Sequence, residues 1–245
     1  MSIPPRPFGR PIAATVGSYD GVHAGHRVLL AHTRAEAQRL GGESLVITFD
    51  PHPRLALDPA CGMRLLSSTK EKELLLSREG IDHLLVIPFD RAFSRLAPAE
   101  FLRLLVERVG VKSLVVGYDH RFGRDKSGGR DLLEELKEEL GLEVVEVPEQ
   151  EMESEHVSST VVRRLIQQGE MAHAARLLGH NYLMHATISL SGEVHSTERH
   201  KLLPPQGEYG ILIEEKEYRL HIAEDKMYAP DFKGEEKDYI IEFIK

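Results

Sequence analysis

The stretch Thr15–His26, which reads TVGSYDGVHAGH, decides how the rest of the chain is interpreted. An apolar run before it, Pro11–Val16, predicts a short buried strand. The stretch itself predicts a turn, because it carries Gly17 and Gly21. A helical pattern from Arg27 onward follows and ends at a pair of glycines. A strand, a glycine-bearing turn and a helix start form an anion site, because backbone amides and the positive end of the helix dipole converge there.

Two histidines three residues apart, His23 and His26, lie where the predicted turn meets the predicted helix. Gly25 between them leaves room for a ligand to approach the backbone. Imidazole groups can donate hydrogen bonds to phosphate oxygens and stabilise the charge that builds up in phosphoryl chemistry. The position of the pair therefore favours a phosphate site over a surface turn with incidental histidines. A metal site made of these two histidines and His52 is the alternative.

Composition narrows the possible functions. With 245 residues, 41% of them hydrophobic, the chain can form one large domain or a main domain with a small companion. A net charge of −8 and the absence of Trp argue against binding to nucleic acid or to anionic membranes. The single cysteine, Cys61, fits a reducing cytoplasm, and no apolar run approaches the ~20 residues of a membrane span. We expect a cytoplasmic protein that binds small phosphate-bearing molecules, whose oligomeric state the sequence does not specify.

Predicted strands and helices alternate along the first part of the chain. The predicted strands are Pro11–Val16, Glu43–Phe49, Leu84–Asp90 (the strand with its exit), Ser113–Val116 and Glu143–Val147. The predicted helices between them are those from Arg27, from Lys70 to Glu79, from Glu100 to Arg108 and from Arg130 to Leu140. This alternation predicts βαβ units and a parallel sheet. Ligands of such open sheets bind at the carboxyl ends of the strands.

Three later segments carry polar groups at strand ends or at a helix start. The run Phe49–Pro53, FDPHP, follows the second predicted strand, and its prolines hold His52 in a stiff loop. The run Gly117–Gly123, GYDHRFG, follows the fourth predicted strand directly. The run Val157–Arg164, VSSTVVRR, predicts a helix whose N-cap is the first or second serine. These segments are the further candidates for ligand contacts.

In chain order, these segments resemble the motifs of a single family. Residues 17–26 resemble GxFDGVHxGH, the signature of the FMN adenylyltransferase (FAD synthetase) module of bacterial bifunctional riboflavin kinase/FAD synthetases. The further segments resemble that family's FxPHP loop (residues 49–53), GxDFRFG loop (117–123), ISSTxxR segment (157–163) and AxxLLGxxY exit (175–182). The chain departs from the pattern at Ser18, where Asn is usual, at Tyr19, where Phe is usual, and at His120, where Phe is usual. The resemblance implies an α/β, Rossmann-like nucleotidyltransferase fold with a parallel sheet over residues 1–182.

The resemblance also implies a reaction and its residues. The reaction is adenylyl transfer from ATP to FMN with Mg²⁺, giving FAD and pyrophosphate. Catalytic roles are implied for His23, His26 and Arg163. The implied ATP contacts are Gly17, Ser18, Tyr19, Asp20, His23, Gly25, His26, Ser159, Thr160 and Arg163. The implied FMN contacts are Phe49, His52, Pro53, Asp119, Arg121 and Phe122. We expect no protein metal site, because Mg²⁺ usually bridges phosphate oxygens with few protein ligands.

The composition changes after Tyr182. Alternating patterns at residues 183–190, 208–213, 217–222 and 239–244 predict a small β-rich C-terminal domain over residues 183–245. By the same resemblance, this domain is a truncated remnant of the riboflavin kinase barrel, because the kinase's glycine-rich loop and Pro-Thr-Ala-Asn motif are absent. We therefore expect no riboflavin kinase activity. Two rival hypotheses are another small-molecule nucleotidyltransferase and a catalytically inactive flavin- or nucleotide-binding protein.

Overall fold

The computed structural model describes residues 8–118, 129–149, 157–224 and 226–244. The chain forms two compact units that interleave along the sequence. The first unit comprises residues 1–19, 25–62 and 76–154, and the second comprises residues 20–24, 63–75 and 155–245. The sequence-based boundary at residue 182 stays a prediction, because the units do not divide the chain at one point. In the described part of the chain, no helix combines the length and the apolar character that crossing a membrane requires.

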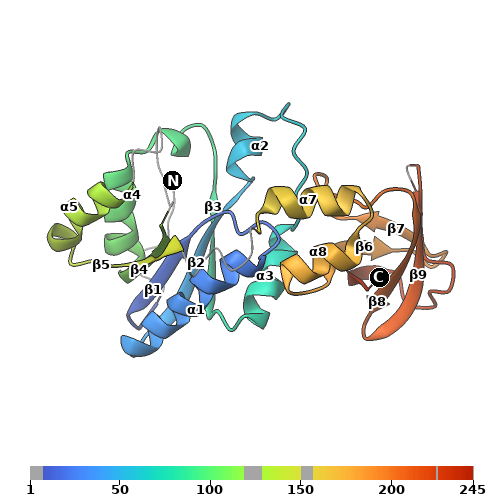
Figure 1. The fold of residues 1–245 in the computed structure, drawn as a ribbon, viewed down its shortest axis with the longest axis horizontal. Helices are drawn as coiled ribbons and strands as arrows, with labels where there is room; N and C mark the ends of the chain where they lie inside the picture. The colour runs from blue at the N-terminus through green and yellow to red at the C-terminus, as the bar shows by residue number, and fades with distance from the viewer. Residues whose placement is uncertain (1–7, 119–128, 150–156, 225, 245) are drawn as a thin grey trace. The chain divides into compact units, whose positions relative to one another are not determined.

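A parallel sheet forms the centre of the first unit (Figure 1). Its strands, in the spatial order β3-β2-β1-β4-β5, are β3 (His83–Pro88), β2 (Glu43–Asp50), β1 (Ile12–Val16), β4 (Val111–Gly117) and β5 (Glu143–Val147). All neighbouring strands pair in parallel, which confirms the predicted Rossmann-like sheet. The chain runs outward from β1 through β2 to β3, and then through β4 to β5 on the other side. The turn after β1 therefore leaves the sheet at its topological switch point, where ligands of such folds bind.

The helices of the sheet region follow the predicted pattern with four differences, one of which is the unpredicted helix α2. They are α1 (Ala24–Arg39), α2 (Pro53–Leu57), α3 (Thr69–Arg78), α4 (Pro98–Leu104) and α5 (Arg130–Leu140). Helix α1 begins three residues before the predicted start, so Gly25 and His26 lie in its first turn. The predicted helix 100–108 is split, because α4 passes into a π-helical turn, η2 (Leu105–Val109). A short 3₁₀ turn, η1 (Phe93–Arg95), precedes α4.

Helix α2 was missed by the sequence analysis, which predicted only a stiff loop. Pro53 occupies the first helical position, where its fixed φ suits the helix and its missing N–H is not needed. His52 is the N-cap, since its Nδ1 accepts a hydrogen bond of 3.1 Å from the backbone N–H of Arg54. The same residues that stiffen the loop therefore start a helix.

The core of the first unit is apolar and lies around the sheet. Helices α4 and α5 contribute to it beside β4 and β5 (Figure 1). Buried members of this core include Ile12 on β1, Ile47 on β2, Leu114 on β4, Phe101 on α4 and Leu136 on α5. Strand β1 is buried along its whole length, as expected for a central strand covered on both faces. The core therefore fixes the strand from which the turn at residues 17–26 leaves.

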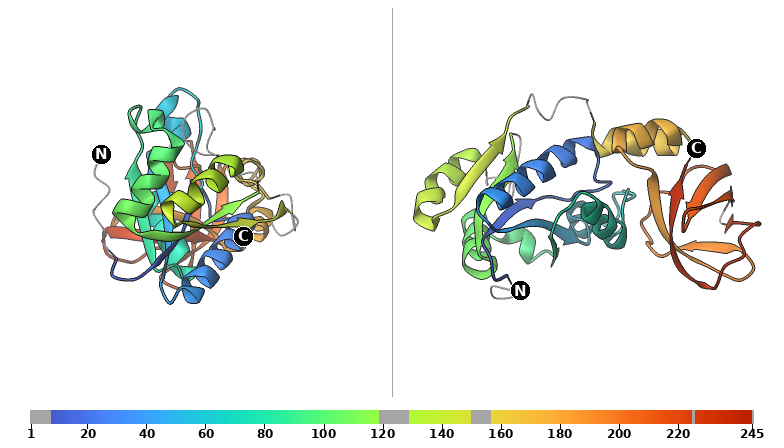
Figure 2. Two further views of the ribbon diagram at one scale, coloured as in Figure 1. Left: turned by 90° about the vertical axis from the view of Figure 1, so that its left-hand side faces the viewer. Right: turned by 90° about the horizontal axis from the view of Figure 1, so that it is seen from below.

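The C-terminal strands of the second unit form a closed antiparallel barrel. They are β6 (Tyr182–Ile188), β7 (Glu193–Ser196), β8 (Gly207–Ile213), β9 (Lys216–Ala223), β10 (Lys226–Tyr228) and β11 (Lys237–Phe243). Figure 2 shows these strands, coloured orange to red, curling around a common interior. The expected truncated remnant is thus a closed barrel, because β10 pairs with both β7 and β9. Strands β7 and β10 were missed because runs so short show too little alternation.

Two helices share the apolar core of this barrel. They are α7 (Ser159–Gln167) and α8 (Met171–Leu178). Their buried residues, among them Val162, Ile166 and Leu178, belong to one cluster with barrel residues such as Tyr182 and Phe243. The helix that carries the ISSTxxR-like segment is therefore anchored in the unit that contains the barrel.

Candidate functional site

Tyr19 anchors the turn after β1, because its side chain is buried in the first unit. This side chain is 1% exposed, and its hydroxyl lies 2.7 Å from the hydroxyl of Thr15. Burial raises the pKa of the Tyr19 phenol above its ordinary value. The ring lies 5.0 Å from the imidazole of His26, centroid to centroid. A Cβ atom at Gly17 would come within 3.0 Å of the Tyr19 ring, so the glycine makes room for the ring.

The next residue, Asp20, belongs to the second unit and is 2% exposed. Its carboxylate accepts hydrogen bonds of 2.9 Å from the backbone N–H groups of Leu66 and Ser67. Its second oxygen forms an ion pair with the guanidinium of Arg163. The backbone carbonyl of Asp20 accepts a hydrogen bond of 3.0 Å from the hydroxyl of Ser159. Asp20 therefore joins three segments that lie far apart in the sequence.

The following two residues hold unusual backbone conformations. Gly21 has a φ of 85°, and a Cβ atom there would lie 2.9 Å from the side chain of Leu66. The N–H of Gly21 donates to the hydroxyl of Ser67 at 2.9 Å, and its carbonyl lies 3.0 Å from Nε2 of His180, which must therefore carry a proton. Val22 has a φ of 42°, which strains a β-branched residue. Surrounding partners therefore impose the shape of this turn.

His23 is uncharged at neutral pH. It is 7% exposed, and its pKa is lowered to about 4, chiefly because burial penalises the charged imidazolium. The Asp20 carboxylate acts in the opposite direction, while the neighbouring Arg163 and His180 lower the pKa further. His23 can therefore donate a hydrogen bond to a ligand without adding positive charge.

The remaining predicted residues of the first unit lie in the turn after β1, at the end of β2 and at the starts of α1 and α2. The Ser18 carbonyl accepts a hydrogen bond of 3.2 Å from the hydroxyl of Thr48 on β2. Phe49, at the end of β2, lies in an aromatic cluster with Phe89 and Phe93, at centroid distances of 5.4 Å and 5.6 Å. His52 and Pro53 begin α2 as its N-cap and first residue. The predicted contacts Asp119, Arg121 and Phe122 lie outside the described residues.

The start of α7 carries the remaining predicted ATP contacts. Ser158 is the N-cap, since its hydroxyl accepts a hydrogen bond of 3.3 Å from the N–H of Val161. The side chain of Thr160 is exposed. Arg163 also donates from Nε to the carbonyl of Arg64 at 2.8 Å, which fixes the plane of its guanidinium. The helix therefore presents an N-terminus, a hydroxyl and a guanidinium together.

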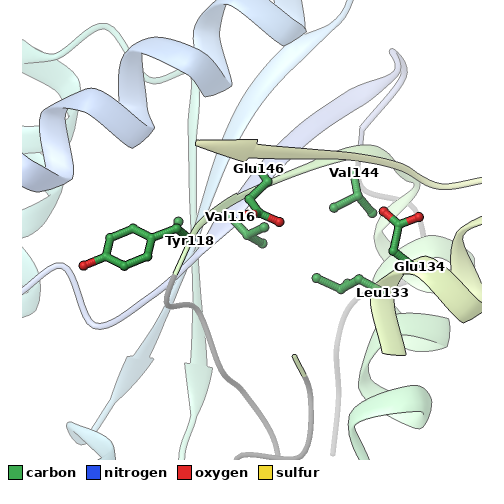
Figure 3. A pocket seen from close by; sticks show the side chains of 7 residues that line it. Val116, Tyr118, Leu133, Glu134, Val144 and Glu146 are labelled. Carbon is green, nitrogen blue, oxygen red and sulfur yellow. The ribbon is translucent and has the colours of Figure 1, made fainter. Parts of the chain in front are cut away.

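A pocket of about 300 Å³ lies in the first unit at the carboxyl ends of β4 and β5 (Figure 3). Two carboxylates line it, that of Glu134 from α5 and that of Glu146 from β5. The other described lining residues are Val116, Gly117, Tyr118, Leu133 and Val144. Sequence reasoning did not predict Glu134 or Glu146 here, because glutamates on an amphipathic helix and on an edge strand resemble ordinary surface charges.

Sequence reasoning also missed the residues that hold the Asp20–Gly21 turn. Ser67 and His180 contact this turn from sequence distances of 46 and 159 residues. Ser67 lies in none of the quoted motifs, and His180 stands at an unspecified position of the AxxLLGxxY-like segment. In the described parts of the chain, no three His, Cys, Asp or Glu side chains form a group that could hold a metal ion, so the alternative histidine metal site has no support.

The fold and this arrangement of side chains define a class of protein. A parallel sheet carries a histidine-bearing turn at its switch point, and the same turn is bonded to a capped helix with a phosphate-suited arginine. This is a Rossmann-like α/β fold whose turn is suited to a phosphate-bearing ligand.

A protein-family model described as FAD synthetase matches residues 7–161, so the chain belongs to the FAD synthetase family. The chain is 30% identical over 210 residues to an FAD synthetase of Listeria monocytogenes, covering 85% of this chain and 84% of that protein. It is 37% identical over 175 residues to a bifunctional riboflavin kinase/FMN adenylyltransferase of Pseudomonas fluorescens, covering 71% of this chain and 56% of that protein. These findings support FMN adenylyltransferase activity in FAD biosynthesis.

A solved structure shows the same fold over nearly the whole chain. It is a crystal structure described as a macrolide-efflux protein from Streptococcus pneumoniae. The TM-score is 0.79 at 24% sequence identity, and the match covers 97% of this chain and 86% of that chain. At this identity the similarity concerns the fold alone.

The lowered pKa of His23 gives the first testable prediction. In an NMR titration of the folded protein, the imidazole of His23 should titrate near pH 4, whereas in denaturant it should titrate near 6.5. As the pH falls from 6.5 to 4, His23 becomes protonated in the unfolded chain while it is still neutral in the folded protein. Protonation therefore favours the unfolded state and should lower the free energy of unfolding by about 3 kcal/mol once the pH reaches 4. A folded-state titration near 6.5 would contradict the buried, neutral state.

Proposed function

We propose that this chain transfers the adenylyl group of ATP to FMN, forming FAD and releasing pyrophosphate. One observation carries the proposal. Asp20 bonds the His23-bearing turn to Ser159 and Arg163, although 139 residues separate Asp20 from Ser159. These are the two segments that the sequence assigns to ATP. Membership of the FAD synthetase family supports the same reaction.

The reaction depends more on aligning the two reacting phosphate groups than on proton transfer by the protein. An oxygen of the FMN phosphate attacks the α-phosphorus of ATP and forms a new P–O bond. The bond from the α-phosphorus to the oxygen bridging it to the β-phosphorus breaks, and pyrophosphate leaves with the electron pair. The attacking phosphate is ionised at pH 7, so no protein base is needed. Catalysis then rests on positioning and on stabilising the charge of the transition state.

Three side chains carry the catalytic roles in this proposal. His23, neutral and buried, donates an N–H to a phosphate oxygen, and His26 does so from the first turn of α1. Arg163 supplies a positive charge that does not depend on pH. Its guanidinium has five N–H donors, so it can hold the Arg64 carbonyl, the Asp20 carboxylate and a phosphate together.

Other members of the predicted ATP set act on the turn itself in this proposal. Asp20 and Tyr19 are positioning residues, because their polar atoms are engaged by protein partners. Gly17 makes room for the Tyr19 ring, while Ser18 and Gly25 are proposed to give the ligand access to the backbone. The exposed hydroxyl of Thr160 is a phosphate contact, while that of Ser159 is committed to Asp20. Phe49, His52, Pro53, Asp119, Arg121 and Phe122 remain the proposed FMN contacts.

We propose that Mg²⁺ enters with ATP and neutralises part of its phosphate charge when bound. Asp20 is the carboxylate within the histidine-bearing turn, and both of its oxygens accept hydrogen bonds from protein donors. The metal would therefore be held mainly by phosphate oxygens, which is a common arrangement for Mg²⁺.

The proposal includes a cytoplasmic setting and small-molecule partners. The single cysteine cannot form an intramolecular disulfide, which fits a reducing compartment. The net charge of −8 does not favour nucleic acid as a partner.

His26→Ala should lower FAD formation by about 100-fold or more at saturating ATP and FMN, because it removes a donor aimed at transition-state charge. The rate is measured by separating FAD from FMN chromatographically. His32→Ala is the control, since His32 lies on the same helix outside the motif, and it should remain near the wild-type rate. Wild-type turnover by His26→Ala would remove His26 from the mechanism.

We also propose that the barrel does not phosphorylate riboflavin. A closed barrel does not by itself hold the phosphates of ATP, and residues 183–245 contain no Pro-Thr-Ala-Asn segment. Incubation with riboflavin, ATP and Mg²⁺ should give neither FMN nor FAD above the level seen with heat-inactivated protein, because FMN formed by a kinase would be converted to FAD. The bifunctional relative from Pseudomonas fluorescens serves as the positive control. Formation of FMN or FAD from riboflavin by the purified chain would show that this part of the proposal is wrong.

A further inference from the structure

A buried ion pair lies in the second unit, outside the sequence motifs. Lys201, from the connection between β7 and β8, pairs with Glu71 at 2.5 Å, and their side chains are 1% and 0% exposed. The ammonium also donates to the carbonyl of Leu66 at 2.6 Å and lies 4.2 Å from the centroid of the Tyr182 ring. Burying two charges costs free energy that their attraction often fails to recover, so the pair is weak evidence for stability alone.

The remaining bonds of Glu71 fix the same region. Its carboxylate accepts hydrogen bonds from the N–H of Ser68 at 3.0 Å and from the N–H of His185 on β6 at 2.6 Å. The Ser68 hydroxyl in turn accepts from the N–H of Glu71 at 3.2 Å, which forms a capping box at the start of α3. The carboxylate thus ties a barrel strand to the segment that leads into α3.

The backbone groups of Leu66 connect this ion pair to the Asp20 turn through hydrogen bonds. The carbonyl of Leu66 is held by Lys201, and its N–H donates to the Asp20 carboxylate at 2.9 Å. Its neighbour Leu65 donates to the carbonyl of His200 at 2.7 Å and accepts from the N–H of Leu202 at 2.8 Å. The segment at residues 65–67 is therefore held by residues 200–202 and itself holds Asp20.

We propose that Lys201 is a positioning residue for adenylyl transfer, which sets the Asp20–His23 turn through the Leu66 peptide groups. The proposal rests on the function proposed above. A purely stabilising role makes a different prediction, because replacing a buried ion pair by neutral residues is often neutral or stabilising. If Lys201 is a positioning residue, a neutral pair keeps the fold intact but removes the lysine donor from the carbonyl of Leu66. Turnover should then fall although the protein remains folded.

The test is the double variant Glu71→Gln/Lys201→Met in the full chain. The matched control is Glu214→Gln/Lys237→Met, since Lys237 also pairs with a glutamate, at 3.1 Å, and lies 5.0 Å from a tyrosine ring, but is exposed. We expect turnover at saturating ATP and FMN to fall about tenfold or more in the first variant and to change less than twofold in the control. The dissociation constant of FMN should stay unchanged, because Phe49 and His52 belong to the other unit. Wild-type turnover in the first variant would overturn the proposal.

A second measurement does not depend on activity. If the turn loosens, His23 becomes hydrated, and its titration in the folded double variant should move from about 4 toward 6.5. Reduced turnover with an unmoved His23 titration would place the action of Lys201 elsewhere and overturn the proposal. A wild-type chain that makes no FAD would instead refute the proposed function, while the His23 titration would still decide whether Lys201 sets the turn.

The unaltered protein offers a check if the double variant does not fold. The amide hydrogens of Leu66 and Ser67 should exchange with solvent as slowly as those of β6, because both donate to a buried carboxylate. Rapid exchange at these two amides would mean that the link from Lys201 to Asp20 is not formed, and the proposal would fail.

Discussion

The buried carboxylate of Asp20 is the group on which the arrangement of the proposed phosphate donors in the second unit depends. A charge removed from water must be paired and hydrogen-bonded, and Asp20 meets this need with the N–H groups of Leu66 and Ser67 and with Arg163. These partners come from two segments, residues 66–67 and Arg163, which lie far from Asp20 and from each other in the sequence. Satisfying one carboxylate therefore brings the histidine-bearing turn, the segment before α3 and the start of α7 into one arrangement.

Under the proposed function, this arrangement would let a chain with a net charge of −8 bind phosphates. The local donors are a neutral buried imidazole, a helix N-terminus and a guanidinium held in place by protein acceptors. The turn that carries His23 is held in shape, since Val22 keeps a strained φ of 42° and Gly21 is bonded at both its N–H and its carbonyl. Donors fixed before the substrate arrives need no reorganisation during the reaction, which is where such sites gain their catalytic effect.

The strands of the sheet and the positions of the motifs could be predicted, because apolar runs and contiguous motifs are signals that neighbouring residues carry by themselves. The strands of the sheet and the cap at Ser158 follow from them. The short strands β7 and β10, which let the barrel close, are too brief to show a period. The hydrogen bonds by which Asp20 connects remote segments could not be predicted, because its partners lie far away in the sequence. The same holds for the buried pair of Lys201 and Glu71, whose members are 130 residues apart. In a sequence, such residues resemble ordinary surface charges.

The most direct test of this account is a double-mutant cycle between Asp20 and Arg163, with the rate of FAD formation from ATP and FMN as the measured quantity. The variants are Asp20→Asn, Arg163→Met and the two combined. If the ion pair joins the two ATP segments, the effects of the single changes are not additive, and the coupling energy is about 1 kcal/mol or more, roughly a fivefold departure in rate. Additive effects, within about 0.5 kcal/mol, would mean that the two residues act independently and would contradict the account.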